Sequence, residues 1–266
     1  QIDCLVLDFS KAFDKVPHQR LLYKLDYYGI RGHNLEWIKE WLTGRTQTVV
    51  VDGQQSNEVH VMSGVPQGTV LGPLMFILYI NDSGDNIRSK MGLFADDCPM
   101  YSEVSGAQDA LRLQEDLDAV VAWSHLWQMD FNLSKCTVLS ITRKKTPLKS
   151  AYQMDGVGLS NVNQQTYLGV EITSNLSWDA HIQKTTGKAI RNLNVVRRNL
   201  HSAPQNIKTL AYSSLVRPML EYSQAVLDTY QQNHISILES VQRQAARFVH
   251  INYQKDASVT SMLDQL

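Results

Sequence analysis

MGLFADDCPMY, residues 91–101, places two adjacent aspartates between two apolar runs. Neighbouring side chains on an extended strand point to opposite faces, so Asp96 and Asp97 can serve one site only if they lie at a tight turn. Aspartate is a favoured turn residue, and we expect a β-hairpin that presents both carboxylates at its tip. An ordinary surface turn has the same local sequence. The interpretation therefore depends on what accompanies the pair along the chain.

Two further stretches accompany these aspartates. IDCLVLDF, residues 2–9, is a short apolar run that indicates a buried strand with the Asp8 carboxylate at its end. SGVPQGTVLGPLMFILYIND, residues 63–82, sets three glycines and two prolines directly before an apolar helix. Such glycines allow a backbone to approach a ligand closely, and helix N-termini attract phosphates. A plain loop before a buried helix explains the second stretch equally well.

The spacing of apolar residues predicts an α+β chain whose strands give way to helices near residue 174. Beyond 2–9, strands are expected at 48–51 and 59–62, paired through a connection longer than two residues, and at 137–142 and 165–173. Helices are expected at 17–28, 35–42, 107–129, 179–200, 205–227 and 234–251. Pro99 lies in the strand that leaves the Asp96-Asp97 turn, and a proline there belongs only at an edge or a bulge.

Length and composition limit the class of protein. The 266 residues are 43% apolar, which permits a sizeable core. The longest apolar run, around Leu74 to Ile80, is far shorter than the roughly 20 residues of a membrane span. Cys4, Cys98 and Cys136 are too few and too far apart to support a disulfide framework or a zinc site. We therefore expect an intracellular protein without a membrane partner.

The net charge is −1, but acidic and basic residues are distributed unevenly along the chain. Residues 180–220 hold seven Lys or Arg and no Asp or Glu, whereas residues 1–100 hold 12 acids against 9 bases. A solvated helix face is the ordinary explanation for such charges. The absence of any acid favours binding of nucleic-acid phosphates.

Asp8, Asp96 and Asp97 together point to metal-dependent chemistry. Nucleotidyl transfer uses two magnesium ions about 3.5–4 Å apart to stabilise the attacking and leaving oxygens. Mg²⁺ takes hard oxygen ligands, usually one or two carboxylates plus substrate phosphates. Because Asp8 is far from the other two aspartates in the sequence, only the fold can bring the three together.

The ordered set of motifs resembles the reverse transcriptase of LINE-type (non-LTR) retrotransposons. DFSKAFDKVPH (8–18), SGVPQGTVLGPLMF (63–76) and FADD (94–97) are similar to the first three palm motifs of that family. NLSKCTVL (132–139) is similar to the fourth motif, and YLGVEI (167–172) to the primer-grip motif. LVRPMLEYS and LESVQRQAARFV resemble the segments that follow the palm. The resemblance covers nearly the whole chain.

The resemblance implies a role for each matching residue. Asp8 and Asp96 would bind two Mg²⁺ ions, for which Mn²⁺ can substitute, and Asp97 would support them. Phe13 would exclude the 2′-hydroxyl of ribonucleotides; a core aromatic is the alternative. Lys135 would act as general acid toward pyrophosphate, with a solvated lysine as the alternative. The incoming dNTP would be contacted by Gln67, Gly68, Lys11 and Lys135, the primer by Tyr167, Leu168 and Gly169, and nucleic-acid phosphates by Lys184, Lys188, Arg191, Arg197 and Arg198.

The resemblance also implies an architecture and partners. Residues 1–174 would form a right-hand polymerase palm, an antiparallel sheet with helices packed on one face, that includes the primer-grip hairpin. Residues 175–266 would form a mostly helical thumb or connection region. The partners would be an RNA template, a DNA primer and dNTPs. The protein would be nuclear when acting at genomic DNA and cytoplasmic as a ribonucleoprotein.

One expectation concerns what lies outside the chain. The sequence begins seven residues before Asp8, so we expect a piece of a longer protein whose fingers and endonuclease domain are missing, with weak or no primer extension by the piece alone. One alternative function is a silent relic that only binds nucleic acid. Another is a different templated polymerase, such as an RNA-dependent RNA polymerase or a group II intron maturase, which Phe13 disfavours.

Overall fold

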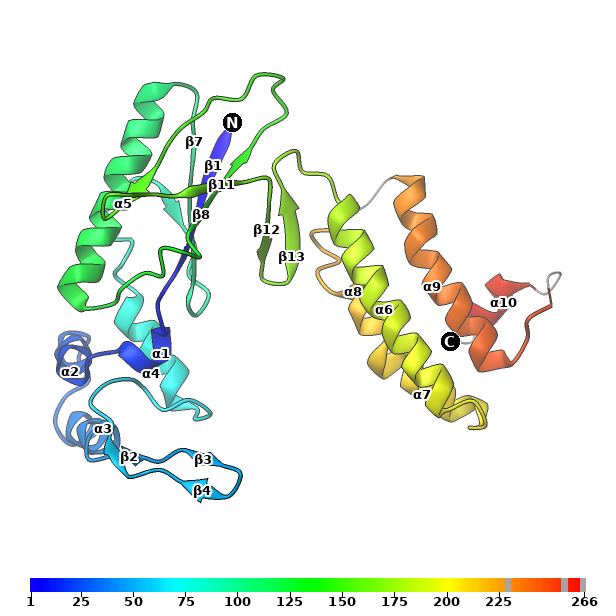
Figure 1. Ribbon diagram of the computed structural model, residues 1–266, viewed down its shortest axis with the longest axis horizontal. Coiled ribbons are helices and arrows are strands. Elements are labelled where there is room, and N and C mark those ends of the chain that lie inside the picture. The colour runs from blue at the N-terminus through cyan, green and yellow to red at the C-terminus, as the bar shows by residue number, and fades with distance from the viewer. Residues whose placement is uncertain (228–230, 255–257, 264–266) are drawn as a thin grey trace. The chain divides into compact units, whose positions relative to one another are not determined.

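The computed structural model describes residues 1–227, 231–254 and 258–263. The chain forms two compact units, residues 1–163 and 164–266, each with a hydrophobic core of its own. The first unit mixes a sheet with helices, and the second is mostly helical (Figure 1). The expected α+β class is therefore confirmed. Within the described ranges, no helix is long and apolar enough to cross a membrane.

A five-stranded sheet forms the centre of the first unit. Its strand order is β11-β8-β1-β7-β6, and every pair is antiparallel except β11 with β8. The strands are β1 (Ile2–Asp8), β6 (Lys90–Met91), β7 (Asp97–Glu103), β8 (Thr137–Ile141) and β11 (Ser160–Val162). A small hairpin, β9 (Gln153–Met154) with β10 (Val157–Gly158), precedes β11.

Helices supply the other half of this core. They are α1 (Ala12–Lys15), α2 (His18–Tyr27), α3 (His33–Leu42), α4 (Leu71–Ile80) and α5 (Ala107–Trp127). Helix α5 packs against β7 and buries Leu113, Leu117, Val120 and Val121, the stripe that its sequence predicts. The helices expected at 17–28, 35–42 and 107–129 are confirmed with small differences at their ends.

The segment between α3 and α4 differs from the expected strand pair. It forms an exposed ribbon in which β2 (Thr46–Gln47) pairs with β5 (Val59–His60), and β3 (Val50–Val51) pairs with β4 (Gln54–Gln55). Asp52 and Gly53 alone join β3 to β4, with φ of 50° and 79°. Both angles are positive, which is the signature of a tight two-residue hairpin turn and a favoured conformation for Asp-Gly. The expectation of a longer connection was wrong.

The second unit begins with a hairpin of β12 (Gln164–Tyr167) and β13 (Val170–Thr173). The apolar spacing predicted a single strand here, whereas the resemblance implied a hairpin. Its helices are α6 (Asp179–Asn199), α7 (Gln205–Leu215), α8 (Arg217–Glu221), α9 (Gln232–His250) and the short α10 (Val259–Leu263). The helix expected at 205–227 is two helices that meet at Val216, because Pro218 cannot continue the hydrogen-bond ladder of α7. Strand β13 packs on α6, so the hairpin groups with the helices and the division falls at 163/164, not near 174.

Pro99 does not lie on an edge strand, contrary to the expectation. It sits in β7 opposite Val6 of β1, with β6 on the other side of β7. Its carbonyl accepts a hydrogen bond from the Gly92 backbone N–H at 2.9 Å, so its ring nitrogen also faces that side. Strand β6 ends at Met91, just before this position. Pro99 therefore lacks a backbone N–H only at a position where the strand pairing of β6 with β7 has already ended.

The loop before α4 is fastened to α1 by four hydrogen bonds. The backbone N–H groups of Gly64 and Val65 donate to the carbonyls of Val16 and Phe13, each at 2.8 Å. The hydroxyl of Ser63 and the side-chain amide of Gln67 both donate to Asp14. Gly64 has a φ of +90°, and a Cβ there would lie 2.7 Å from the Asp14 carbonyl oxygen. Glycine is required here because the loop lies directly against the backbone of Asp14. The sequence suggested close approach to a ligand, and no contact of Gly64 tests that.

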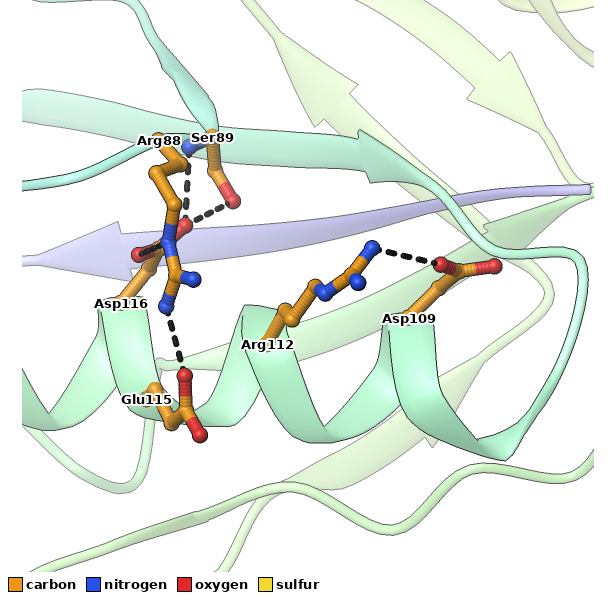
Figure 2. A network of polar contacts seen from close by, with 6 residues as sticks. All are labelled: Arg88, Ser89, Asp109, Arg112, Glu115 and Asp116. Carbon is orange, nitrogen blue, oxygen red and sulfur yellow. Dashed lines mark hydrogen bonds and ion pairs between the residues drawn. The ribbon is translucent and has the colours of Figure 1, made fainter.

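The loop before β6 is held to α5 by ion pairs (Figure 2). The backbone N–H and hydroxyl of Ser89 donate to the Asp116 carboxylate at 2.8 and 2.5 Å, and Arg88 pairs with both Glu115 and Asp116. Burial by itself raises the pKa of Asp116, but these hydrogen bonds and Arg88 outweigh it and lower the pKa. These contacts fix the start of β6, the strand that leads to the Asp96-Asp97 turn.

Lys24 is buried where α2, α4 and α5 meet. Its ammonium donates to the Tyr79 carbonyl at 2.6 Å and to the Asp82 carboxylate. It also lies 4.9, 4.8 and 3.9 Å from the ring centroids of Tyr79, Trp123 and Trp127. Burial lowers the pKa of Lys24, which the hydrogen bond to Asp82 opposes. The Lys24 ammonium thus links α2, α4 and α5. It does so through cation–π contacts with the three rings and through its hydrogen bond to a carbonyl near the C-terminal end of α4.

We predict that Lys24→Met destabilises the first unit by about 2–3 kcal/mol, because the Tyr79 carbonyl and the half-buried Asp82 carboxylate lose the ammonium, and Asp82 keeps only its hydrogen bond from the Trp123 indole N–H. Urea unfolding followed by tryptophan fluorescence measures this, since Trp123 and Trp127 surround the charge. Lys39→Met, at an exposed position of α3, is the matched control and should change the free energy of unfolding by less than about 0.5 kcal/mol. Equal stability of the two variants would contradict the prediction.

Candidate active site

The pairing of β1 with β7 brings the distant aspartates together. Asp8, the last residue of β1, lies directly opposite Asp97, the first residue of β7. Directly paired residues on neighbouring strands have their side chains on the same face of the sheet. Along β1, Leu5 and Leu7 are fully buried on the opposite face, so Asp8 lies on the more open face. The two carboxylates therefore leave the same end and face of the sheet.

A two-residue turn places the third carboxylate beside them. Phe94 and Asp97 exchange backbone hydrogen bonds of 3.0 and 3.1 Å, which leaves Ala95 and Asp96 as the turn itself. Ala95 has a φ of 52°, in the left-handed region that a residue with a Cβ seldom adopts. The expected hairpin tip is therefore confirmed, and its backbone is strained. Such strain is concentrated at functional sites.

The carboxylates influence one another electrostatically. The pKa of Asp97 is raised above its ordinary value, first by burial and then by the negative charges of Asp96 and Asp8. Like charges at short range disfavour ionisation of one another. The arrangement is therefore one that a cation would stabilise.

Lys135 is the cation that the chain itself provides. Backbone hydrogen bonds from Ser10 to Asp130 and from Asn132 to Asp8 hold the segment before β8 against the end of β1. This brings the Lys135 Nζ to 3.2 Å from the Asp8 Oδ2. That oxygen is buried and makes no hydrogen bond among the described residues. The sequence placed Lys135 near nucleotide phosphates; in the structure it faces a metal-ligand candidate.

The donor set suits magnesium without enclosing it. The described residues contain no group of three His, Cys, Asp or Glu side chains that could hold a metal ion by themselves. Mg²⁺ is usually bound by one or two carboxylates with substrate phosphates and water completing its shell. The Asp8 oxygen without a hydrogen bond and the repulsion among the three aspartates fit such an open site. Asp8 and Asp96 are the residues that could hold the ion.

The residues expected to contact the nucleotide lie on α1 and the loop bound to it. Phe13 is half-buried and stacks on Phe76 with ring centroids 4.6 Å apart. Gln67 is exposed, and its amide is fixed by the Asp14 carboxylate at 3.0 Å. Gly68 and Lys11 are exposed, and both have positive φ, 75° and 53°. No pattern in the sequence indicated that Asp14 would hold Gln67.

The expected primer-grip residues form the turn of the β12–β13 hairpin. Leu168 and Gly169 join the two strands with φ of 47° and 80°, directly after Tyr167. The Tyr222 hydroxyl donates to the Leu168 carbonyl at 2.7 Å, and a Cβ on Gly169 would lie 3.1 Å from the Tyr222 ring. Tyr222 supports this turn, a role that its place in the sequence did not reveal. The turn belongs to the second unit.

The expected nucleic-acid contacts lie along α6, but they are not equivalent. Lys184 pairs with Glu171, which is 6% exposed, and the bonds from Lys184 and Thr166 outweigh burial and lower the pKa of Glu171. Lys184 is thus a structural link between α6 and β13. The other four show no ion pair among the described residues, and all but the half-buried Arg197 are exposed: Lys188, Arg191, Arg197 and Arg198.

Comparisons with known proteins show which family the sequence resembles. Residues 3–172 match the family described as Reverse transcriptase (RNA-dependent DNA polymerase). The chain is 30% identical over 258 residues to the RNA-directed DNA polymerase from mobile element jockey of Drosophila funebris, covering 91% of this chain and 27% of that protein. It is 25% identical over 266 residues to the probable RNA-directed DNA polymerase from transposon BS of Drosophila melanogaster, covering 93% and 29%. Apo telomerase from Candida tropicalis aligns with a TM-score of 0.49 and 12% identity, over 94% of this chain and 42% of that one.

The family match includes all three aspartates, the glycine-containing loop and the β12–β13 hairpin. The chain spans between 27% and 29% of the length of four curated relatives from insect mobile elements. The resemblance to non-LTR retrotransposons that the motifs suggest is therefore confirmed. This chain belongs to the reverse transcriptase (RNA-dependent DNA polymerase) family, in the branch found in non-LTR retrotransposons.

Proposed function

We propose that this chain carries the catalytic centre for RNA-directed DNA synthesis, with the transfer of a deoxynucleotide to a primer 3′-hydroxyl. The observation that carries the proposal is the register of β1 with β7, which sets Asp8 opposite Asp97 and beside the turn that holds Asp96. Asp8 and Asp96 would bind two Mg²⁺ ions, or Mn²⁺ in their place, and Asp97 would support them. The bound ions supply charge stabilisation for the attacking and leaving oxygens.

The chain's own residues would position the reactants and move a proton. The primer oxygen would attack the α-phosphorus of the dNTP, the bond to pyrophosphate would break, and the hydroxyl proton would pass to solvent water. Lys135 is a candidate to protonate the pyrophosphate, because its ammonium already lies at the carboxylate cluster. Gln67, held by Asp14, together with Gly68 and Lys11, would contact the nucleotide.

The two units would take the parts of a right-hand polymerase. The first unit, residues 1–163, would form the palm, and the helices of the second unit would form the thumb. The β12–β13 hairpin, which groups with the second unit, would present Tyr167, Leu168 and Gly169 to the primer. Lys188, Arg191, Arg197 and Arg198 would contact phosphates of the RNA template and DNA primer, while Lys184 would do so only by leaving Glu171. Exposed cations without an ion pair support this division of roles.

We predict that Asp8→Asn or Asp96→Asn lowers Mg²⁺-dependent dNTP incorporation on an RNA template by at least about a hundredfold. A lost metal ligand removes several kcal/mol of transition-state stabilisation, and each 1.4 kcal/mol is tenfold in rate. Single-nucleotide incorporation by an excess of the full-length parent protein measures this. The control is Asp85→Asn, at an exposed position outside the cluster, which should retain activity. Activity that survives both substitutions would contradict the metal-ligand roles of Asp8 and Asp96, whereas a complete lack of activity in the unaltered protein would favour a relic.

We predict that Phe13→Ala relaxes the exclusion of ribonucleotides and raises the rNTP-to-dNTP incorporation ratio by about ten- to a hundredfold. A shape-based barrier is worth roughly 1–3 kcal/mol for a small added group. The measurement is the ratio of kcat/KM for matched rNTP and dNTP. Phe131→Ala, which removes an aromatic stacked on Phe9, is the control for general disturbance and should leave the ratio unchanged. Strong rNTP use by the unaltered chain would instead indicate an RNA product.

We predict that the 266-residue chain alone extends primers weakly or not at all. It spans only 27–29% of four curated relatives, so most of a comparable protein lies outside it. A processivity assay on a long RNA template measures this. Robust DNA synthesis by the isolated chain would overturn the prediction.

A further inference from the structure

A basic loop between β8 and β9 remains outside the proposed function. Residues 143–149 contain four cations, Arg143, Lys144, Lys145 and Lys149, and no acid. All four are exposed, and none forms an ion pair or a side-chain hydrogen bond within the described parts of the chain. An exposed cluster of one charge sign attracts counter-ions strongly when no acidic side chain pairs with it, and among the described residues none does. We call these residues the distal basic loop.

The distal basic loop is fixed to the sheet at one point. The side-chain amide of Gln1 both donates to the Leu148 carbonyl and accepts from the Leu148 N–H, each at 2.9 Å. Just beyond the loop, the Tyr152 hydroxyl donates to Asp3 at 2.7 Å, and Asp3 is fully buried in β1. The cations therefore lie on both sides of an anchored residue. A fixed loop binds a ligand with less loss of conformational entropy than a free tail does.

The strand register puts this loop at the opposite end of the sheet from the carboxylates. Ile141, the last residue of β8, pairs with Ile2 at the beginning of β1, whereas Asp8 ends β1. Six residues of strand span about 20 Å. Glu103 pairs with Ile2 from the other side and is an exposed acid at this end of the sheet. The loop is thus separate from the site where nucleotide phosphates would bind.

We propose that the distal basic loop is a second nucleic-acid contact, which binds the phosphate backbone about 20 Å from the catalytic carboxylates. Short Lys/Arg-rich runs are typical of nucleic-acid patches and of nuclear-import signals. The anchoring by Gln1 and the position on the sheet that carries the carboxylates favour the nucleic acid. The inference rests on nucleic acid being a partner of this chain, as in the proposed function, but it does not depend on catalysis. RNA that extends beyond the active site, or a duplex, would supply the phosphates.

The test is the salt dependence of binding by the 266-residue chain. Fluorescence anisotropy measures Kd over a range of NaCl concentrations for a labelled single-stranded RNA and for an RNA–DNA duplex. Each lysine that contacts a phosphate contributes about 1 to the slope of log K against log salt concentration. Lys144→Gln/Lys145→Gln should reduce the slope by about 2 and weaken binding regardless of sequence. The matched control is Lys39→Gln/Lys90→Gln, which removes the same charge from exposed positions elsewhere in the first unit.

The outcomes are distinct. A reduced slope in the loop variant alone, with unchanged thermal unfolding, supports the proposal, and the probe that shows it identifies single strand or duplex as the source of the phosphates. An unchanged slope for both probes, or an equal reduction in the control, overturns it. Asp96→Asn should leave the slope of the chain unaltered while abolishing dNTP incorporation by the full-length parent protein. Loss of incorporation with a normal slope, or the reverse, therefore separates failure of the proposed function from failure of this inference.

Discussion

The central constraint in this molecule is the repulsion among three carboxylates that the sheet holds together. Asp8 and Asp97 are paired by backbone hydrogen bonds between β1 and β7, and the tight turn at Ala95 adds Asp96. The raised pKa of Asp97 reflects burial and this repulsion. Folding energy from the buried sheet and helices keeps the charges near one another.

The surrounding structure fixes the positions of Asp8, Gln67 and Lys135. Burial of Leu5 and Leu7 sets the face to which Asp8 points, because a slip of one residue would turn every side chain of β1 over. Gly64 allows the loop before α4 to lie on the backbone of Asp14, which in turn orients Gln67. Lys135 reaches Asp8 because the preceding segment pairs with the end of β1. Each of these contacts joins segments that are distant in the sequence.

Local patterns predicted the elements well where one face of each element is buried. The stripe of α5, the strand that ends at Asp8 and the turn at Asp96 follow from periodicity and turn chemistry. Patterns failed where a tertiary partner or a backbone angle decided the outcome. The Asp52-Gly53 turn needed two positive φ angles, which residue type permits but does not require. The support of Leu168 by Tyr222 and of Gln67 by Asp14 depends on contacts that no local spacing encodes.

The proposed function requires that Asp8 and Asp96 bind the same metal centre. Diffraction at the manganese edge from crystals of the chain soaked with Mn²⁺ and a dNTP tests it most directly. If they do, anomalous density for manganese will lie within coordinating distance, about 2.0–2.3 Å, of carboxylate oxygens from both Asp8 and Asp96. Manganese bound by only one of them, or bound only elsewhere on the chain, would contradict it.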